Sequence, residues 1–185
     1  MRPEFPVQKS SYLLCGLRAA LLILGLMVAA PAFAQDATAS AQAALKGTWK
    51  SVCMNLGSGV FITITSTYDG AGHASDKVVY YSDAGCGAPT GLVKTNSSVS
   101  YSVGAPIQVG SRQAHAINST IQSWQLTQNG SVIKSGGAVA TQYDIFAIEG
   151  KKLYTSGLSR GQAGPITSAA GRPSTLDTTN YFTKQ

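Results

Sequence analysis

Histidine and cysteine are scarce in this chain of 185 residues, which contains two histidines and three cysteines. His73 and His115 lie far apart, and no cysteine stands near either of them at a spacing typical of a zinc site. Calcium sites concentrate their oxygen ligands within one loop. Asp69, Asp76 and Asp83 are instead separated by seven-residue steps, so we interpret them as acids of turns. The sequence therefore predicts no metal site and no cofactor.

Charged residues are also sparse, at 12% of the chain. Lys151-Lys152 is the only basic doublet outside the N-terminal leader, and no basic run or stripe is visible in the sequence. Nucleic-acid binding needs a concentrated basic footprint. We therefore do not expect a nucleic acid among the partners.

The one long apolar run is too short to cross a bilayer. Ala19–Ala30 reads AALLILGLMVAA, 12 residues, whereas a spanning helix needs about 20. Basic residues precede the run, and it is followed by Ala32-Phe33-Ala34, a small-x-small pattern. Together these features predict a secretory signal peptide over residues 1–34, cleaved before Gln35. An uncleaved anchor is the alternative. We expect a secreted or periplasmic protein without stable membrane insertion.

Cleavage there would leave a chain with a net charge of +4, from 11 basic and 7 acidic residues. It would also remove Cys15, so that Cys53 and Cys86 remain as an even pair. Disulfides form and persist in oxidising compartments. We therefore predict a Cys53–Cys86 bridge, which contributes about 3–4 kcal/mol by the chain-entropy relation.

Alternating polar and apolar residues dominate the chain after residue 45. Residues 98–103 read SVSYSV, and residues 60–65 and 115–121 also place apolar side chains on one face. No sustained helical periodicity follows residue 45, and turn signals separate the segments, among them Gly104-Ala105-Pro106. This pattern predicts about eight or nine short strands in an all-β sandwich or barrel. Residues 35–44, rich in small side chains, form either a linker or a short helix before it.

Leu45-Lys46-Gly47-Thr48-Trp49 resembles the Gly-x-Trp first strand of lipocalins and other calycins. The later pattern is similar to that of small exported bacterial proteins with a lipocalin-like domain. Its residues here are Cys53, Tyr81, Asp83, Cys86, Leu153-Tyr154 and the segment RPSTLD at 172–177.

The resemblance implies that residues 45–185 form a single antiparallel up-and-down β-barrel of about eight strands. Its last strand, near Tyr181, would pair with the first, and Trp49 would close one end. Gly47 and Trp49 would then be structural residues. By its position, Arg172 would be the late basic residue that stacks on the tryptophan.

Aromatic residues occur in nearly every expected strand, where they either fill the core or line a cavity. Barrels of about eight strands can enclose one small molecule. We therefore expect an exported, non-enzymatic binding protein that holds a small apolar or aromatic ligand in a cavity of about 300 Å³ or more. The candidate ligand-binding residues are Tyr80, Tyr101, His115 and Tyr143. The alternative is a β-sandwich surface, adhesion or protein-interaction module.

One literal hydrolase motif occurs, Gly157-Leu158-Ser159-Arg160-Gly161. A nucleophile elbow needs a following helix and a later histidine, but Gly164-Pro165 follows Ser159 and no histidine does. The motif is therefore interpreted as accidental, and no catalytic residue is assigned. The sequence does not predict the oligomeric state.

Overall fold

The computed structural model describes residues 30–156 and 166–185, with side chains from residue 35. Most of the expected signal peptide, together with Ser159, lies outside these residues. One α-helix, a short 3-10 helix and ten strands are described in this part of the chain. They are α1 (Ala30–Leu45), β1 (Gly47–Ser51), β2 (Met54–Gly57), β3 (Val60–Tyr68), β4 (His73–Tyr81), β5 (Pro89–Val109), β6 (Arg112–Gln128), β7 (Ser131–Gly136), β8 (Gln142–Glu149), β9 (Lys152–Thr155), η1 (Ala169–Gly171) and β10 (Phe182–Lys184).

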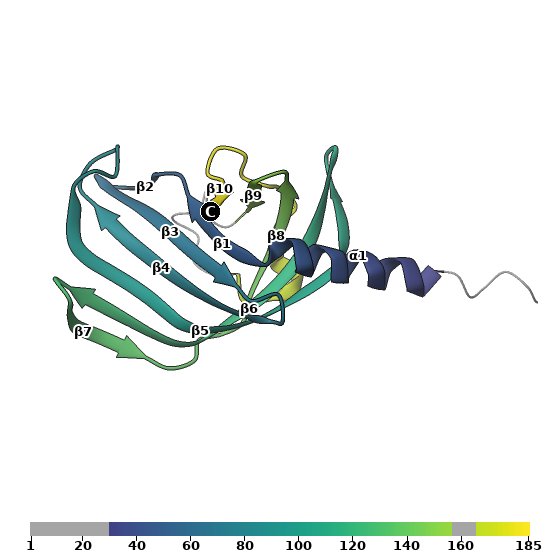
Figure 1. The fold of residues 1–185 in the computed structure, drawn as a ribbon, viewed down its shortest axis with the longest axis horizontal. Helices are drawn as coiled ribbons and strands as arrows, with labels where there is room; N and C mark the ends of the chain where they lie inside the picture. The colour runs from purple at the N-terminus through teal and green to yellow at the C-terminus, as the bar shows by residue number, and fades with distance from the viewer. Residues whose placement is uncertain (1–29, 157–165) are drawn as a thin grey trace, which may run out of the picture.

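Eight of the described strands close into one antiparallel ring, in the order β1-β3-β4-β5-β6-β8-β9-β10 and back to β1 (Figure 1). Each strand of the ring pairs with the next along the chain, which is the up-and-down arrangement. Trp49 in β1 pairs with Lys184 in β10, and Val52 N–H donates to the carbonyl of Tyr181 at 3.0 Å. The barrel prediction is confirmed, and the sandwich alternative is wrong because the first and last strands belong to one sheet.

Two strands lie outside the ring. β2 continues the line of β1 beside β3, and β7 pairs with β6 only, among the described strands. The β6–β7 hairpin turns at Asn129-Gly130, where both residues have positive φ, 50° and 84°. That is the backbone of a tight hairpin turn, which Asn-Gly favours. The sequence did not predict β7.

β5 is longer than the sequence predicts. It runs through Gly104-Ala105-Pro106, where we expected a turn. The pairing of β5 with β6 shifts between Val103 and Pro106, and a bulge of this kind tolerates a proline that cannot donate to the ladder. The proline therefore marks an irregularity within one strand, and the expected turn is wrong.

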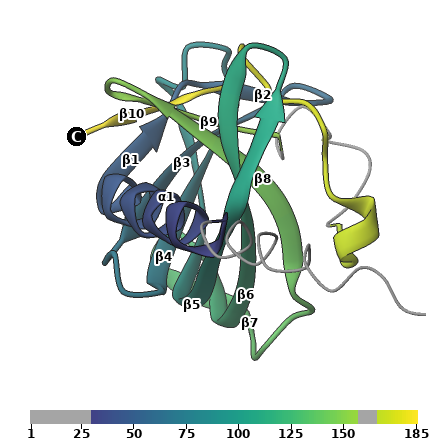
Figure 2. The same ribbon diagram turned by 90° about the vertical axis from the view of Figure 1, so that its right-hand side faces the viewer.

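Helix α1 lies across one end of the barrel (Figure 2). Its last residue, Leu45, is fully buried, and Gln42 Nε2 donates to the carbonyl of Gly70 at 3.1 Å. Thr38 Oγ1 lies 3.3 Å from the carbonyl of Gly104 on β5. Of the two alternatives for residues 35–44, the structure shows the helix, which is packed on the barrel.

The indole of Trp49 joins this helix to the barrel core. It is fully buried, and its Nε1–H donates to the carbonyl of Leu45 at 2.7 Å. Lys184 Nζ lies 5.1 Å from the centre of the Trp49 ring. Gly47 has a φ of 120°, and a Cβ there would approach Lys184 Cε to 3.1 Å, so the turn into β1 favours glycine. The stacking prediction for Arg172 is wrong, because Lys184 occupies that position.

The predicted Cys53–Cys86 disulfide is present, with its Cα atoms 5.8 Å apart. It links the connection between β1 and β2 to the β4–β5 loop. Asp83 organises that loop, because its carboxylate accepts hydrogen bonds from the N–H groups of Gly85, Gly87 and Ala88. These bonds, chiefly those from Gly87 and Ala88, lower the pKa of Asp83. A bridge of this kind is consistent with an oxidising compartment.

No helix within the described residues has the length and apolar character needed to cross a membrane.

Candidate functional site

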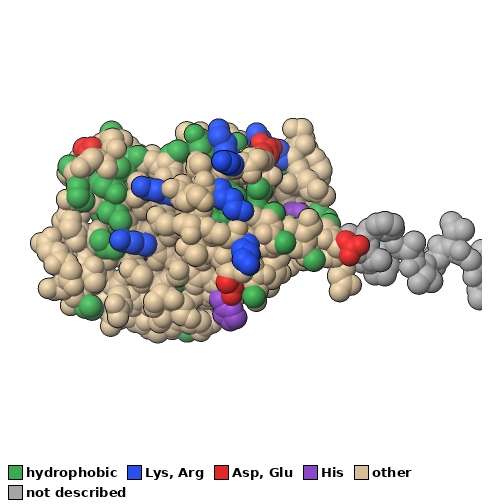
Figure 3. Space-filling model, in the orientation of Figure 1, with side chains coloured by type: hydrophobic (Ala, Val, Ile, Leu, Met, Phe, Trp, Pro, Cys, Tyr) green, Lys and Arg blue, Asp and Glu red, His purple; other side chains and the backbone are tan. Residues whose placement is uncertain are grey.

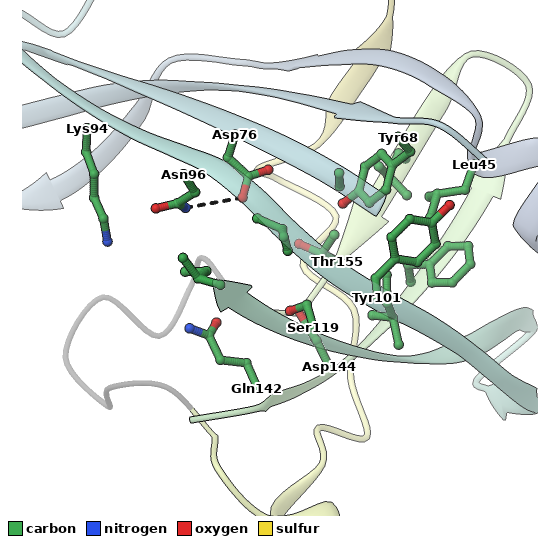
Figure 4. Close-up of a pocket in the computed structure, with 16 residues that line it drawn as sticks. Leu45, Tyr68, Asp76, Lys94, Asn96, Tyr101, Ser119, Gln142, Asp144 and Thr155 are labelled. Atoms are coloured by element: carbon green, nitrogen blue, oxygen red, sulfur yellow. Dashed lines mark hydrogen bonds between the residues drawn. The ribbon is translucent and has the colours of Figure 1, made fainter. Parts of the chain in front are cut away.

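The barrel contains a cavity of about 280 Å³, slightly below the lower limit of about 300 Å³ expected for a ligand-binding barrel (Figure 4). Its walls come from β3, β4, β5, β6, β8 and β9, and Leu45 of α1 lies at one end. The side chains at that end are apolar or aromatic: Leu45, Tyr68, Tyr101, Ile117, Phe146 and Leu153. Polar side chains line the rest, chiefly Asp76, Lys94, Asn96, Ser119, Gln142 and Asp144.

Two tyrosines form the aromatic end of the cavity. The rings of Tyr68 and Tyr101 meet edge to face, with their centres 5.2 Å apart, an arrangement that the ring quadrupoles favour. Burial raises the pKa of Tyr68 strongly, and the negative charges of Asp76 and Asp144 raise it further. Tyr68 is therefore a neutral side chain in a region of negative potential.

The hydroxyl of Tyr101 is not directed at the polar part of the cavity. Burial raises the pKa of Tyr101, and the backbone N–H groups of Gly72 and Gly70 oppose this shift. The hydroxyl is buried and has no hydrogen-bond partner within the described residues. Tyr101 contributes its ring to the cavity wall, as Figure 4 shows.

Asp76 and Asn96 form the centre of the polar part. They are direct partners across β4 and β5, and Asn96 Nδ2 donates to Asp76 Oδ2 at 3.3 Å. Asn96 is only 6% exposed, and its Oδ1 has no hydrogen-bond partner. Figure 4 shows this oxygen pointing away from Asp76, toward the Lys94 end of the cavity. The cavity wall thus contains a carboxylate on β4 and, on the paired residue of β5, a buried acceptor without a partner.

The other two charged side chains of the cavity are engaged with the protein. Asp144 Oδ1 accepts a hydrogen bond from its neighbour Ile145 N–H at 2.7 Å and another from Ser156 Oγ. Lys94 lies at the end away from Leu45, with its Nζ 5.7 Å from the centre of the Trp124 ring.

Of the four predicted ligand-binding residues, Tyr101 alone lines the cavity. Tyr80 is on the same face of β4 as Asp76 but lies four positions further along the strand. It pairs with Ile62 of β3, and neither residue lines the cavity. Tyr143 lies on the outer face of β8, between the two inward residues Gln142 and Asp144.

Tyr143 is covered from outside by Arg172, whose guanidinium carbon lies 5.3 Å from the centre of the ring. Arg172 Nη1 donates to the carbonyl of Ile117 at 3.0 Å and to that of Asp144 at 2.5 Å, and Nη2 donates to Asn118 Oδ1 at 2.5 Å. Through these hydrogen bonds, Arg172 holds the segment that follows η1 against β6 and β8.

His115 lies at the α1 end of the barrel, outside the cavity between the strands. Its ring is 5.8 Å from that of Phe146, and its Nδ1 is 3.4 Å from the carbonyl of Gly104. It lines a separate groove of about 380 Å³ between α1 and the β6 and β8 strands. Arg112 and Glu149 form a 2.7 Å ion pair at the rim of this groove.

Two of the three acids interpreted as turn acids have that role. Asp69 Oδ1 accepts hydrogen bonds from Ala71 N–H and His73 N–H, and these bonds lower the pKa of Asp69. Asp83 is the second. Asp76 is different, because it lies within β4 and faces the cavity. Among the described residues, no group of three His, Cys, Asp or Glu side chains is arranged to hold a metal ion.

Basic side chains that are scattered in the sequence are gathered by the fold. Cross-strand pairing aligns Lys77, Thr65, Lys50, Thr183 and Lys152 in one row across β4, β3, β1, β10 and β9. Figure 3 shows Lys and Arg side chains over this face, with acidic ones near its margins. The outer face around β1 is therefore basic, which the linear sequence did not indicate.

No protein-family model matches the chain, and a search of curated proteins finds no significant match. The closed eight-stranded antiparallel barrel is consistent with a calycin-like fold, and this likeness rests on architecture alone.

Proposed function

We propose that the chain is an exported, non-enzymatic, lipocalin-like carrier that holds one small ligand inside its barrel. The observation that carries the proposal is the 280 Å³ cavity within a closed ring of strands. Its aromatic end offers apolar contact to a ligand, and its polar groups can fix the ligand's orientation. Ligand sites are generally concave and mostly apolar with a few placed polar groups.

Export is supported by the leader and by the disulfide. The basic residues, apolar run and Ala32-Phe33-Ala34 of the leader have the order of a secretory signal, and Cys53–Cys86 suits an oxidising compartment. N-terminal sequencing of protein from the exported fraction should begin at Gln35. Recovery of that fraction with Met1 attached would reject the cleaved leader.

A cavity-filling substitution tests the carrier proposal. Ala74 lines the cavity, so Ala74→Leu should reduce the affinity for an apolar aromatic probe such as n-propylbenzene at least tenfold. Ala71→Leu, at an exposed position in the adjoining turn, is the matched control and should leave the affinity unchanged. Titration calorimetry measures both. Failure of the parent protein to bind n-propylbenzene or either of the size-matched probes used below would reject an open ligand cavity.

A second candidate, a protein-interaction module, is favoured by β7. Val132 and Ile133 are 56% and 57% exposed, and β7 pairs with β6 only, within the described chain. Such an edge can pair with the same edge of a second copy. Light scattering should then show a dimer that Ile133→Lys converts to a monomer. A monomeric parent protein at all accessible concentrations would reject this candidate.

A further inference from the structure

We infer that the ligand of the barrel is a small organic cation, with a protonated amine at Asp76 and Asn96 and an apolar or aromatic body against Tyr68. This inference rests on the proposed carrier function and specifies its ligand class. It is carried by the juxtaposition of a carboxylate and an unsatisfied buried carbonyl oxygen in the wall of one cavity.

The side-chain atoms of Asp76 and Asn96 that remain free to bind a ligand are hydrogen-bond acceptors. Asn96 donates its amide to Asp76, which leaves Asn96 Oδ1 without a partner at 6% exposure. Among the described residues, Asp76 accepts that one 3.3 Å bond and takes part in neither ion pair, since these join His73 to Asp69 and Arg112 to Glu149. An ammonium group has three donors and no acceptor, so it suits a wall in which the free hydrogen-bonding atoms of Asp76 and Asn96 are all acceptors.

The charges around the site also favour a cation. Tyr68 lies in the negative potential of Asp76 and Asp144, which adds to the effect of burial in raising its pKa. Lys94 is the one basic side chain among the described lining residues. Its Nζ lies against the Trp124 ring, at the far end of the cavity from Leu45. A carboxylate ligand placed at Asp76 would instead meet a like charge and an acceptor.

The aromatic end provides the rest of the binding surface. Tyr68 and Phe146 line the same cavity as Asp76, and the Tyr68 and Tyr101 rings form an edge-to-face pair. At about 30 Å³ for each water-sized group, the 280 Å³ cavity has room for about nine such groups. An arylalkyl amine such as 2-phenylethylammonium has this size.

Three probes of matched size separate charge from shape: 2-phenylethylammonium, 2-phenylethanol and n-propylbenzene. Titration calorimetry on the purified protein should show that the ammonium binds at least tenfold more tightly than the alcohol, because charge-assisted hydrogen bonds are stronger than neutral ones. Equal or tighter binding of the alcohol would overturn the cation inference while leaving the carrier function in place. Failure of all three probes to bind would reject both.

Asp76→Asn tests whether the Asp76 carboxylate causes the tighter binding of 2-phenylethylammonium than of 2-phenylethanol. The variant keeps the side-chain shape, so the affinity for n-propylbenzene should change less than twofold, whereas the preference for the ammonium over the alcohol should disappear. Asp36→Asn removes one negative charge from an exposed position of α1 and should keep the preference. A preference that survives Asp76→Asn would overturn the assignment. The parent protein's probe series decides the ligand class even where the variant does not fold.

Discussion

Truncation of Trp49 should be the most destabilising single change at the closed end of the barrel. The indole is fully buried, its N–H bonds to Leu45 at 2.7 Å and Lys184 covers its face at 5.1 Å. Trp49→Ala should cost about 3–5 kcal/mol as a large core truncation. Loss of the hydrogen bond adds about 1 kcal/mol, so the total is about 4–6 kcal/mol.

Trp49→Phe separates the ring from its N–H group. It retains most of the packing but leaves the carbonyl at the end of α1 without its donor, so we expect a loss of about 1–3 kcal/mol. Trp124→Phe is the matched control, because Trp124 is only partly buried and makes no N–H hydrogen bond within the described residues.

Urea unfolding followed by circular dichroism, with the disulfide intact, measures the free energy of unfolding of each variant. The reasoning would be refuted if Trp49→Ala lost less than about 1 kcal/mol, the cost of one ordinary hydrogen bond. The reasoning would equally be refuted if Trp124→Phe lowered the free energy of unfolding more than Trp49→Phe does.

Three further outcomes are expected. Replacing Cys53 and Cys86 together by serine should lower the free energy of unfolding by about 3–4 kcal/mol, and thiol counting on the exported protein under denaturing, non-reducing conditions should find no free thiol. Because burial raises the pKa of Tyr68 in the folded state, the unfolded chain ionises first, and stability should fall as the pH rises above about 10. Tyr68→Phe should reduce that fall, as urea unfolding at about pH 8 and about pH 11 would show. Arg172→Ala should cost about 2–3 kcal/mol through the loss of charged hydrogen bonds, and Arg172→Lys should recover only part of it, because an ammonium cannot reproduce the planar fork.

Each of these three has a result that would contradict it. Two free thiols would reject the bridge in the exported protein. An unchanged free energy of unfolding between the two pH values would show that Tyr68 is solvated in the folded state. Full recovery by Arg172→Lys would mean that the charge matters at this position and the geometry of the guanidinium does not.

The architecture could be predicted because it depends on local patterns. Alternation along β6 places Ile117 and Ile121 on one face, and a two-residue period allows only one choice of inward side chains. The even pair of cysteines left after the leader indicated the bridge, and the resemblance of Leu45–Trp49 to a calycin first strand implied the closed end. These features can be recognised within single segments, without knowledge of which strands are neighbours.

The candidate site could not be predicted in the same way, because it depends on register between strands. Asp76 lies beside apparent turn residues in the sequence, and the structure shows it paired with Asn96 and lining the cavity. The signal was present in the alternation of Ala74, Asp76, Val78 and Tyr80, which places the acid on the same face as apolar residues. Lys184 was missed for the same reason, since it covers Trp49 through the pairing of β10 with β1.

The position of the cavity follows from the distribution of large and small inward side chains. Trp49, Leu153 and Phe182 fill the barrel beside β1, β9 and β10, whereas Ala74 and Ser119 face the interior from β4 and β6. An eight-stranded barrel is just wide enough for side chains to fill it, so small residues on one side leave space. A carboxylate in a dry interior is costly unless it is paired. Asp76 is partly buried and accepts one bond from Asn96 among the described residues, so water or a cation in this space can stabilise its charge, and the amine series distinguishes these two occupants.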